Sequence, residues 1–263
     1  TAIGPYALFL NTEGRYNTAI GENALCANTT GGCNNAQGRN ALGANTTGTH
    51  NNAIGWGALQ SNTEGCYNNA IGYNTLNSNT TGVNNNAIGN QALCKNTTGS
   101  NNNAMGCNAL HDNTTGGRNL AIGWYPMSSN TTGNDNIALG SYRPLFSNIA
   151  GNYNVAAGYS SLYNNTSGSN NNAIGESAML SNTTGCYNNA LGSKALYNSL
   201  SGCHNFAAGQ CALYSNWGGC YNTAIGCNAL KCNTTGSCNN AIGTYALQCN
   251  TTGFKNNALG YYA

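Results

Sequence analysis

The sequence predicts an all-β protein built as a parallel β-solenoid, because three features repeat along it. Glycine recurs every 17 residues from Gly4 to Gly140 and, after one 18-residue step, from Gly158 to Gly260. A second glycine follows the first in each cycle, and alanine always stands two residues before the first glycine. A period this short and regular is typical of one unit stacked on itself, here in about 16 coils.

The repeat reads Asn-x-Ala-(Ile/Leu)-Gly-x-x-Ala-Leu-x-x-Asn-Thr-Thr-Gly-x-x and is clearest in residues 85–101 and 239–255. Seventeen residues with two glycines are too short for a helical hairpin, since helical repeats need about 33 residues or more. Gly, Asn-Asn and Asn-Thr-Thr-Gly are turn-forming sequences, because Gly and Asn tolerate positive φ. The apolar segments between the turns therefore have the length of short strands.

Asparagine opens every full copy of the repeat. Neighbouring coils of a β-solenoid lie roughly 4.8 Å apart, so equivalent residues stand above one another. Stacked side-chain amides can bond to each other and satisfy polar groups that a narrow fold cannot leave unpaired. We predict an asparagine ladder that includes Asn17, Asn34, Asn51, Asn68, Asn85 and Asn102.

The doublets Ala-Ile and Ala-Leu suggest that both faces of each strand are covered, since adjacent side chains on a strand point to opposite faces. We expect Ile and Leu to fill the interior of the coil and the smaller Ala to face another chain. This interpretation favours self-association of parallel rods, as a homotrimer or an end-to-end filament. The alternative is a thin monomeric solenoid in which Ala stands at a tight bend.

The motif Asn-x-Ala-Ile-Gly-x-x-Ala resembles the head repeats of trimeric autotransporter adhesins. Its longer form, at residues 17–31 and 222–236, resembles repeats of phage tail-fibre and related bacterial surface proteins. The resemblance covers essentially the whole chain and implies a left-handed parallel β-roll, with three chains side by side, that serves as a shaft or an adhesive head. The 17-residue period and the many cysteines depart from the adhesin pattern.

Residues 1–263 are expected to form a single repeat array, cut from a longer chain, with one irregular segment near residues 124–153. Here Pro126 and Pro144 replace the usual Ala, and one residue is inserted around Arg143. Proline removes a backbone donor and belongs at edges or bulges, so we expect a bulge or bend.

Charged residues are few, with 8 Lys and Arg against 6 Asp and Glu. There is no basic stripe for nucleic acid and no apolar run of transmembrane length. No nucleophile is paired with a base, the carboxylates are scattered, and the histidines lie far apart in the sequence. We therefore expect no enzymatic activity, no cofactor and no metal.

The 13 cysteines fall into repeat columns. Stacked positions about 4.8 Å apart lie within the Cα separation of disulfides, roughly 4.4 to 6.8 Å. Disulfides between coils are therefore expected, and oxidised cysteines would indicate an extracellular protein. Pairing within a coil, Cys26 with Cys33 or Cys232 with Cys238, is an alternative, as is a role as small apolar fillers. The candidate residues between coils are Cys232 with Cys249, and Cys186, Cys203 and Cys220.

The Asn-Thr-Thr column has the Asn-x-Thr/Ser pattern of N-glycosylation acceptors in secreted proteins. The alternative is that the same residues serve only to form a turn. The candidate acceptors are Asn28, Asn45, Asn79, Asn96, Asn113, Asn130, Asn165, Asn182, Asn233 and Asn250.

The sequence as a whole predicts a non-enzymatic structural fibre protein, an appendage shaft or adhesive stalk that lies outside the cell or on a cell or virion surface. Its expected partners are copies of itself and surface glycans or a cell-surface receptor. A second hypothesis is an ice-binding β-solenoid, because regular ladders of Thr and Asn can order water.

Overall fold

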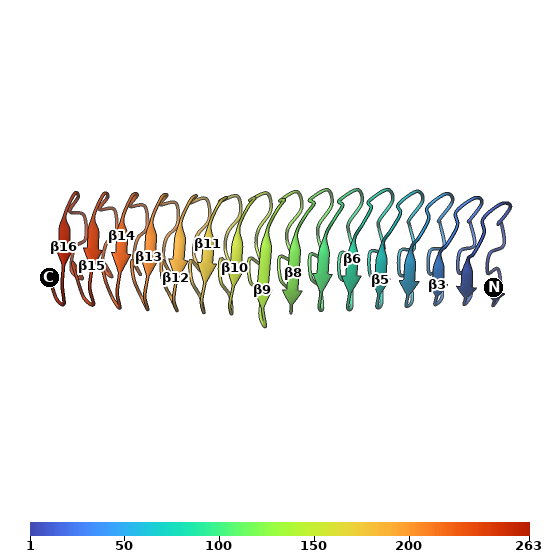
Figure 1. Ribbon diagram of the computed structural model, residues 1–263, viewed down its shortest axis with the longest axis horizontal. Coiled ribbons are helices and arrows are strands. Elements are labelled where there is room, and N and C mark those ends of the chain that lie inside the picture. The colour runs from blue at the N-terminus through green and yellow to red at the C-terminus, as the bar shows by residue number, and fades with distance from the viewer. The chain divides into compact units, whose positions relative to one another are not determined.

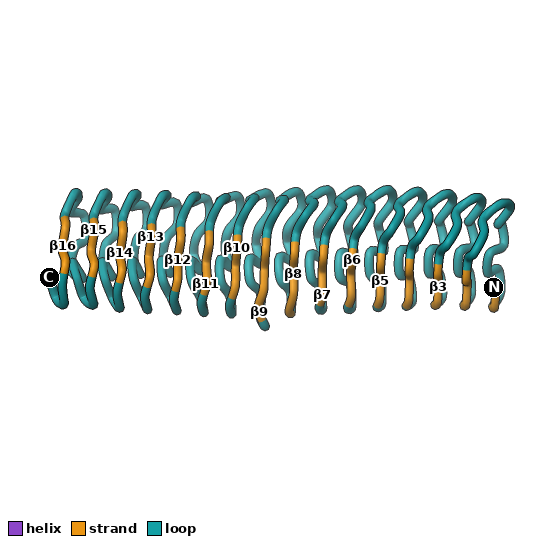
Figure 2. The backbone as a smooth tube through the Cα atoms, viewed as in Figure 1, coloured by secondary structure: helices purple, strands orange, loops and turns teal.

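The computed structural model describes residues 1–263 and consists of short strands joined by turns, with no helix (Figure 2). All the strand pairs are parallel. The strands are β1 (Ala2–Ile3), β2 (Thr18–Ile20), β3 (Asn35–Gln37), β4 (Asn52–Ile54), β5 (Asn69–Ile71), β6 (Asn86–Ile88), β7 (Asn103–Met105), β8 (Leu120–Gly123), β9 (Ile137–Gly140), β10 (Val155–Ala157), β11 (Asn172–Ile174), β12 (Asn189–Leu191), β13 (Phe206–Ala208), β14 (Thr223–Ile225), β15 (Asn240–Ile242) and β16 (Asn257–Leu259).

The chain divides into two compact units, Thr1–Thr132 with β1 to β8 and Gly133–Ala263 with β9 to β16. Within each unit every strand pairs with the strand one repeat further along, and the strands stack in chain order (Figure 1). The register follows the repeat, so that Ala36 lies opposite Ala53. The prediction of an all-β parallel solenoid with a 17-residue repeat is confirmed. The division falls inside the irregular segment seen in the sequence.

The interior of each coil is built from alanine, leucine and asparagine. The strand alanine is fully buried in every coil from Ala19 to Ala241, and so is the Ala-Leu pair that follows in most coils, as at Ala24 and Leu25. The residue after the strand alanine points outward, and Ile20 is 38% exposed. The expectation that Leu fills the interior is confirmed. The assignment of Ile to the interior and of the strand Ala to an outer contact was wrong, because the alternation of the strand turns Ala inward.

Left-handed backbone conformations explain why Ala24 and Leu25 both point inward. Leu25 has φ 51° and lies in the turn that follows β2, where the alternation of side chains along a strand no longer applies. Most coils contain three such residues, as at Asn23, Leu25 and Cys33. The left-handed region costs roughly 1–3 kcal/mol for a residue with a side chain, and asparagine is among the residues that tolerate it best. At the leucine position, burial of the largest side chain of the coil offsets this cost.

The two glycine columns stand where backbones of neighbouring coils approach closely. Glycines of the first column, apart from Gly140, have φ between 122° and 138°. A Cβ on Gly89 would lie 2.6 Å from the carbonyl oxygen of Gly106 in the next coil. In the second column, a Cβ on Gly82 would lie 2.5 Å from the carbonyl oxygen of Gly99. Both columns therefore exclude any side chain.

The inserted residue lies in the corner that follows β9. Ala138 pairs with Ala156, an offset of 18 residues, whereas Ala156 pairs with Ala173 at the usual offset. At this corner Gly140 lacks the positive φ of the other glycines in its column. The predicted bulge is thus a local change at one corner.

Pro126 is accommodated with its hydrogen bond to the preceding coil intact. In regular coils the equivalent alanine donates its N–H within its own turn, as Ala24 does to Gly21. The carbonyl of Pro126 still accepts the N–H of Leu110 from the preceding coil. Proline therefore costs only a bond within the turn at this position.

Adjacent glycines in one turn provide a direct test of the close approach. A Cβ on Gly219 would lie 2.3 Å from the carbonyl oxygen of Gly236, whereas a Cβ on Gly218 would have its nearest neighbour at 3.9 Å. We expect Gly219→Ala to lower the free energy of unfolding by about 3 kcal/mol, and Gly218→Ala to change it by less than about 0.5 kcal/mol. Urea denaturation followed by circular dichroism measures both, and equal effects would contradict the proposed packing.

Candidate functional site

The predicted asparagine ladder is present, and it bonds mainly to the backbone. The N–H of Asn34 donates to Oδ1 of Asn17 at 2.9 Å, and Nδ2 of Asn34 donates to the carbonyl of Gly48 at 2.8 Å. Direct bonds between amides are longer, at 3.2 Å from Asn51 to Asn34. The same pattern includes Asn17, Asn34, Asn51, Asn68, Asn85 and Asn102, all of which are buried.

A second asparagine ladder, which the sequence analysis missed, is formed by the Asn-Thr-Thr column. Nδ2 of Asn45 donates to Oδ1 of Asn28 at 2.7 Å and to the carbonyl of Gly48 at 3.0 Å. Side chains in this column are fully buried except near the ends of the chain. The sequence signal for this ladder is a glycine three residues after the asparagine, because the carbonyl of that glycine lies within reach of the asparagine side-chain amide.

The candidate glycosylation sites are the members of this second ladder. N-glycosylation uses the same Nδ2 atom that here donates its protons inside the coil, so a glycan is incompatible with this folded arrangement. The geometry agrees with the alternative, a role in the turn. The residues concerned are Asn28, Asn45, Asn79, Asn96, Asn113, Asn130, Asn165, Asn182, Asn233 and Asn250.

The threonine that follows most of these asparagines also forms a hydrogen bond within the fold. Oγ1 of Thr29 donates to the carbonyl of Thr46 at 3.1 Å, and Oγ1 of Thr46 donates to Thr63 in the same way. The next residue, such as Thr30, is exposed. The Asn and first Thr ladders on which the ice-binding hypothesis depends thus bond within the chain, and only the second Thr column faces solvent.

Serine interrupts the second ladder at Ser199. Asn182 Oδ1 and Ser199 Oγ are buried and have no hydrogen-bond partner. On the far side, Nδ2 of Asn216 donates only to Gly219. The shorter side chain of serine leaves a gap between the amides of Asn182 and Asn216.

The outward side chains of the strands form what we call the strand face of each unit. It consists of the residues immediately before and after each strand alanine, such as Asn86 and Ile88 beside Ala87. Asparagines on this face form a third, half-exposed ladder, in which Nδ2 of Asn69 donates to Oδ1 of Asn86 at 2.7 Å. The neighbouring column is mainly Ile and Leu, with Ile88 37% exposed and Ile174 46% exposed.

Aromatic side chains in equivalent positions stack on one another at the corners. Tyr187, His204 and Tyr221 form a row of three rings with centroids 4.9 and 4.8 Å apart. Trp56 and Tyr73 stack at 5.0 Å. Within such a row only the ring faces that meet are covered, and Tyr187 and Tyr221 remain 53% and 62% exposed.

All 13 cysteines are free thiols in the structure. The pair Cys232 and Cys249 is exposed and lies in neighbouring coils, while Cys186, Cys203 and Cys220 are half-buried. The disulfides expected from the sequence are not formed here, and their formation on oxidation stays a prediction.

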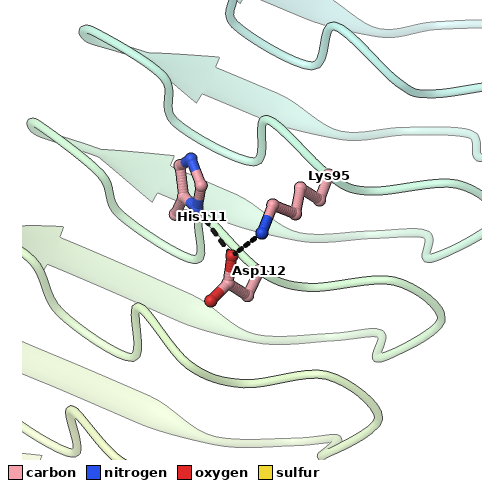
Figure 3. A network of polar contacts seen from close by, with 3 residues as sticks. All are labelled: Lys95, His111 and Asp112. Atoms are coloured by element: carbon pink, nitrogen blue, oxygen red, sulfur yellow. Dashed lines mark hydrogen bonds and ion pairs between the residues drawn. The ribbon is translucent and has the colours of Figure 1, made fainter.

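A polar cluster joins two neighbouring coils at Lys95, His111 and Asp112 (Figure 3). Oδ1 of Asp112 lies 2.8 Å from Nζ of Lys95 and 2.7 Å from Nδ1 of His111. Partial burial acts to raise the pKa of Asp112, but the hydrogen bonds and positive charge of Lys95 and His111 outweigh it and lower the pKa. The hydrogen bond to Asp112 raises the pKa of Lys95.

Burial raises the pKa of the neighbouring thiol of Cys94, with an opposing effect of Lys95. This thiol therefore stays protonated more readily than an exposed one, and a thiolate nucleophile is disfavoured. The ion pair between Lys95 and Asp112 therefore links two neighbouring coils.

The geometry defines a class of protein, a β-solenoid repeat protein. Its repeated features are the hydrogen-bonded asparagine ladders and the strand face. No group of three or more His, Cys, Asp or Glu side chains is arranged to hold a metal ion. None of the structure could serve as a membrane-spanning helix. No protein-family model matches the chain, and no match was found among the curated proteins.

The break in the second ladder predicts a stabilising substitution. In Ser199→Asn, the new amide would donate to Oδ1 of Asn182 and accept from Nδ2 of Asn216. We expect the free energy of unfolding to rise by about 1–2 kcal/mol. The matched control is Asn165→Ser, which opens an equal gap in a complete part of the ladder and should destabilise. Chemical denaturation measures both, and a destabilising Ser199→Asn would contradict the role given to the gap.

The lowered pKa of Asp112 predicts a pH-dependent contribution to stability. The contribution is present at neutral pH and is lost as pH falls through the pKa of Asp112, below the ordinary 3.8. Asp112→Asn should thus lower the denaturation midpoint slightly at pH 7, because exposed pairs are screened, and have no effect at pH 2. Glu64→Gln, which removes a carboxylate outside any ion pair, is the control. A difference between wild type and Asp112→Asn that persists at pH 2 would rule out the ion pair as its cause.

Proposed function

We propose that this protein is a non-enzymatic structural fibre protein, a shaft or adhesive stalk whose chains associate side by side through the strand face. The proposal places it outside the cell or on a cell or virion surface. The resemblance of its repeat to adhesin-head and phage tail-fibre repeats supports this location and a left-handed trimeric β-roll.

The observation that carries the proposal is the chemistry of the strand face. None of the 14 charged residues stands on it. Its half-exposed or exposed Ile and Leu recur in most coils, beside asparagines that still offer half-exposed amides. Contiguous apolar surface of this kind marks an interaction site.

A second copy of the chain fits this face better than an unrelated partner. A copy has the same spacing between coils, so its Ile and Asn columns can match over many repeats. A stable interface buries about 800 Å² on each partner, and a repeated surface can reach that area by extending along the coils. The alternation of apolar and amide columns also allows hydrogen bonds beside the apolar contacts.

The strand face can be tested by placing one charge on it. We expect the wild-type protein to associate in analytical ultracentrifugation, and Ile88→Glu to weaken that association at least about tenfold, because an unpaired carboxylate would be buried. The matched control is Thr98→Glu, which puts the same charge in an exposed turn position where Glu13 and Glu64 stand in other coils.

The control should associate like the wild type, and both variants should keep the circular dichroism of the native fold. A wild-type protein that remains monomeric at all concentrations would sink the proposal. Equal weakening by Ile88→Glu and Thr98→Glu would show that the strand face is not the interface.

A further inference from the structure

We propose that Cys186, Cys203 and Cys220 form a binding site for soft monovalent cations such as Cu(I) or Ag(I), with each ion held linearly between thiolates of neighbouring coils. These three cysteines occupy the same repeat position in successive coils and are all half-buried, so the sulfurs are within reach of solvent.

Hydrogen bonds hold the three side chains in one orientation. Sγ of Cys203 accepts the N–H of Cys186 at 3.2 Å, and Sγ of Cys220 accepts the N–H of Cys203 at 3.2 Å. Sγ of Cys186 accepts the N–H of Ser169 at 3.3 Å. Each thiol also approaches the carbonyl two residues before it in the chain. The sulfurs therefore form a straight row that repeats with the coils.

The spacing of this row fits a linear ion. The adjoining rings of Tyr187, His204 and Tyr221 are 4.9 and 4.8 Å apart, and equivalent sulfurs in the same orientation repeat at about this distance. A metal–thiolate bond is about 2.3 Å long, as in zinc sites, so a linear sulfur–metal–sulfur unit spans roughly 4.6 Å. One ion therefore fits between two neighbouring sulfurs, and a second ion requires the Cys203 sulfur to move off the line of the row, because a thiolate that bridges two metals is bent.

The chemistry of the row selects the ion. Thiolates are soft ligands that favour Cu(I) over harder cations. A tetrahedral zinc site needs four ligands around one point, and no such convergence exists here. A disulfide requires its sulfurs to approach to about 2.05 Å, which would break the hydrogen bonds that orient them.

The row of three thiols takes up two ions. Three thiols and two monovalent cations give two metal-bridged pairs in which Cys203 is shared, and three protons are released. The product has three thiolates and two cations, a net charge of −1. No oxidant or reductant takes part.

Substitutions by serine give a test with a distinctive pattern. Serine occupies this same position at Ser169 and Ser237 and accepts the same backbone N–H, so the fold should be kept. Cys203→Ser leaves thiols two coils apart, too far for one ion, and should abolish both sites. Cys186→Ser or Cys220→Ser should abolish only one.

The measurement is native mass spectrometry of the reduced chain titrated with Ag(I), with excess imidazole to remove ions held by a single thiol. We expect Cys203→Ser to bind two ions fewer than the wild type, and each end variant one fewer. X-ray absorption should give two sulfur neighbours per silver. Circular dichroism checks that all variants remain folded.

Equal losses from the middle and end variants would mean that the thiols bind independently and would overturn the proposal. No loss from any variant would overturn it as well. Cys94→Ser, which removes a thiol with no cysteine in the equivalent position of either neighbouring coil, is the control and should leave the number of bridged ions unchanged.

Discussion

The hydrogen bonds that asparagine side-chain amides form between coils are the interaction on which the rest of this structure depends. A coil of 17 residues has many corners, and each corner leaves backbone donors and acceptors that no strand ladder satisfies. The two buried asparagine ladders meet this demand, since the carbonyl of Gly31 accepts from both Asn17 and Asn28. The glycines are required because nothing larger than hydrogen fits between these amides and the next coil.

Much of the fold could be predicted from the sequence, because the repeat period measures the length of a coil directly. The glycine columns, the leucine interior and the first asparagine ladder are all encoded in patterns that simple stereochemistry explains. The place of the inserted residue could also be read from the single 18-residue step, and the structure puts the irregularity at the corner after β9. Where one residue type occupies the same repeat position in most coils, its role can be inferred from the backbone conformation or packing that this position requires.

The orientation of side chains was harder to predict. A left-handed residue such as Leu25 interrupts the alternation expected for a strand, so that Ala24 and Leu25 both turn inward. Ile20, in contrast, lies on a regular strand and points outward, although it is as apolar as leucine. Asparagine raised a similar difficulty, because the same Asn-Thr-Thr sequence suits an exposed turn and a buried ladder. Burial of Asn28 depends on the carbonyl of Gly31 and on the amides above and below, which belong to the packed array.

The variable positions of the repeat have a consequence for folding. Coils that are nearly identical could pair with the wrong neighbour, skipping a whole coil while keeping every alanine and glycine in its place. Such a shift would separate Trp56 from Tyr73, Lys95 from Asp112 and His204 from its two tyrosines. These pairs differ from coil to coil, and each is satisfied only when the correct neighbours meet. The contacts at these variable positions thus favour the correct pairing of neighbouring coils while the chain folds.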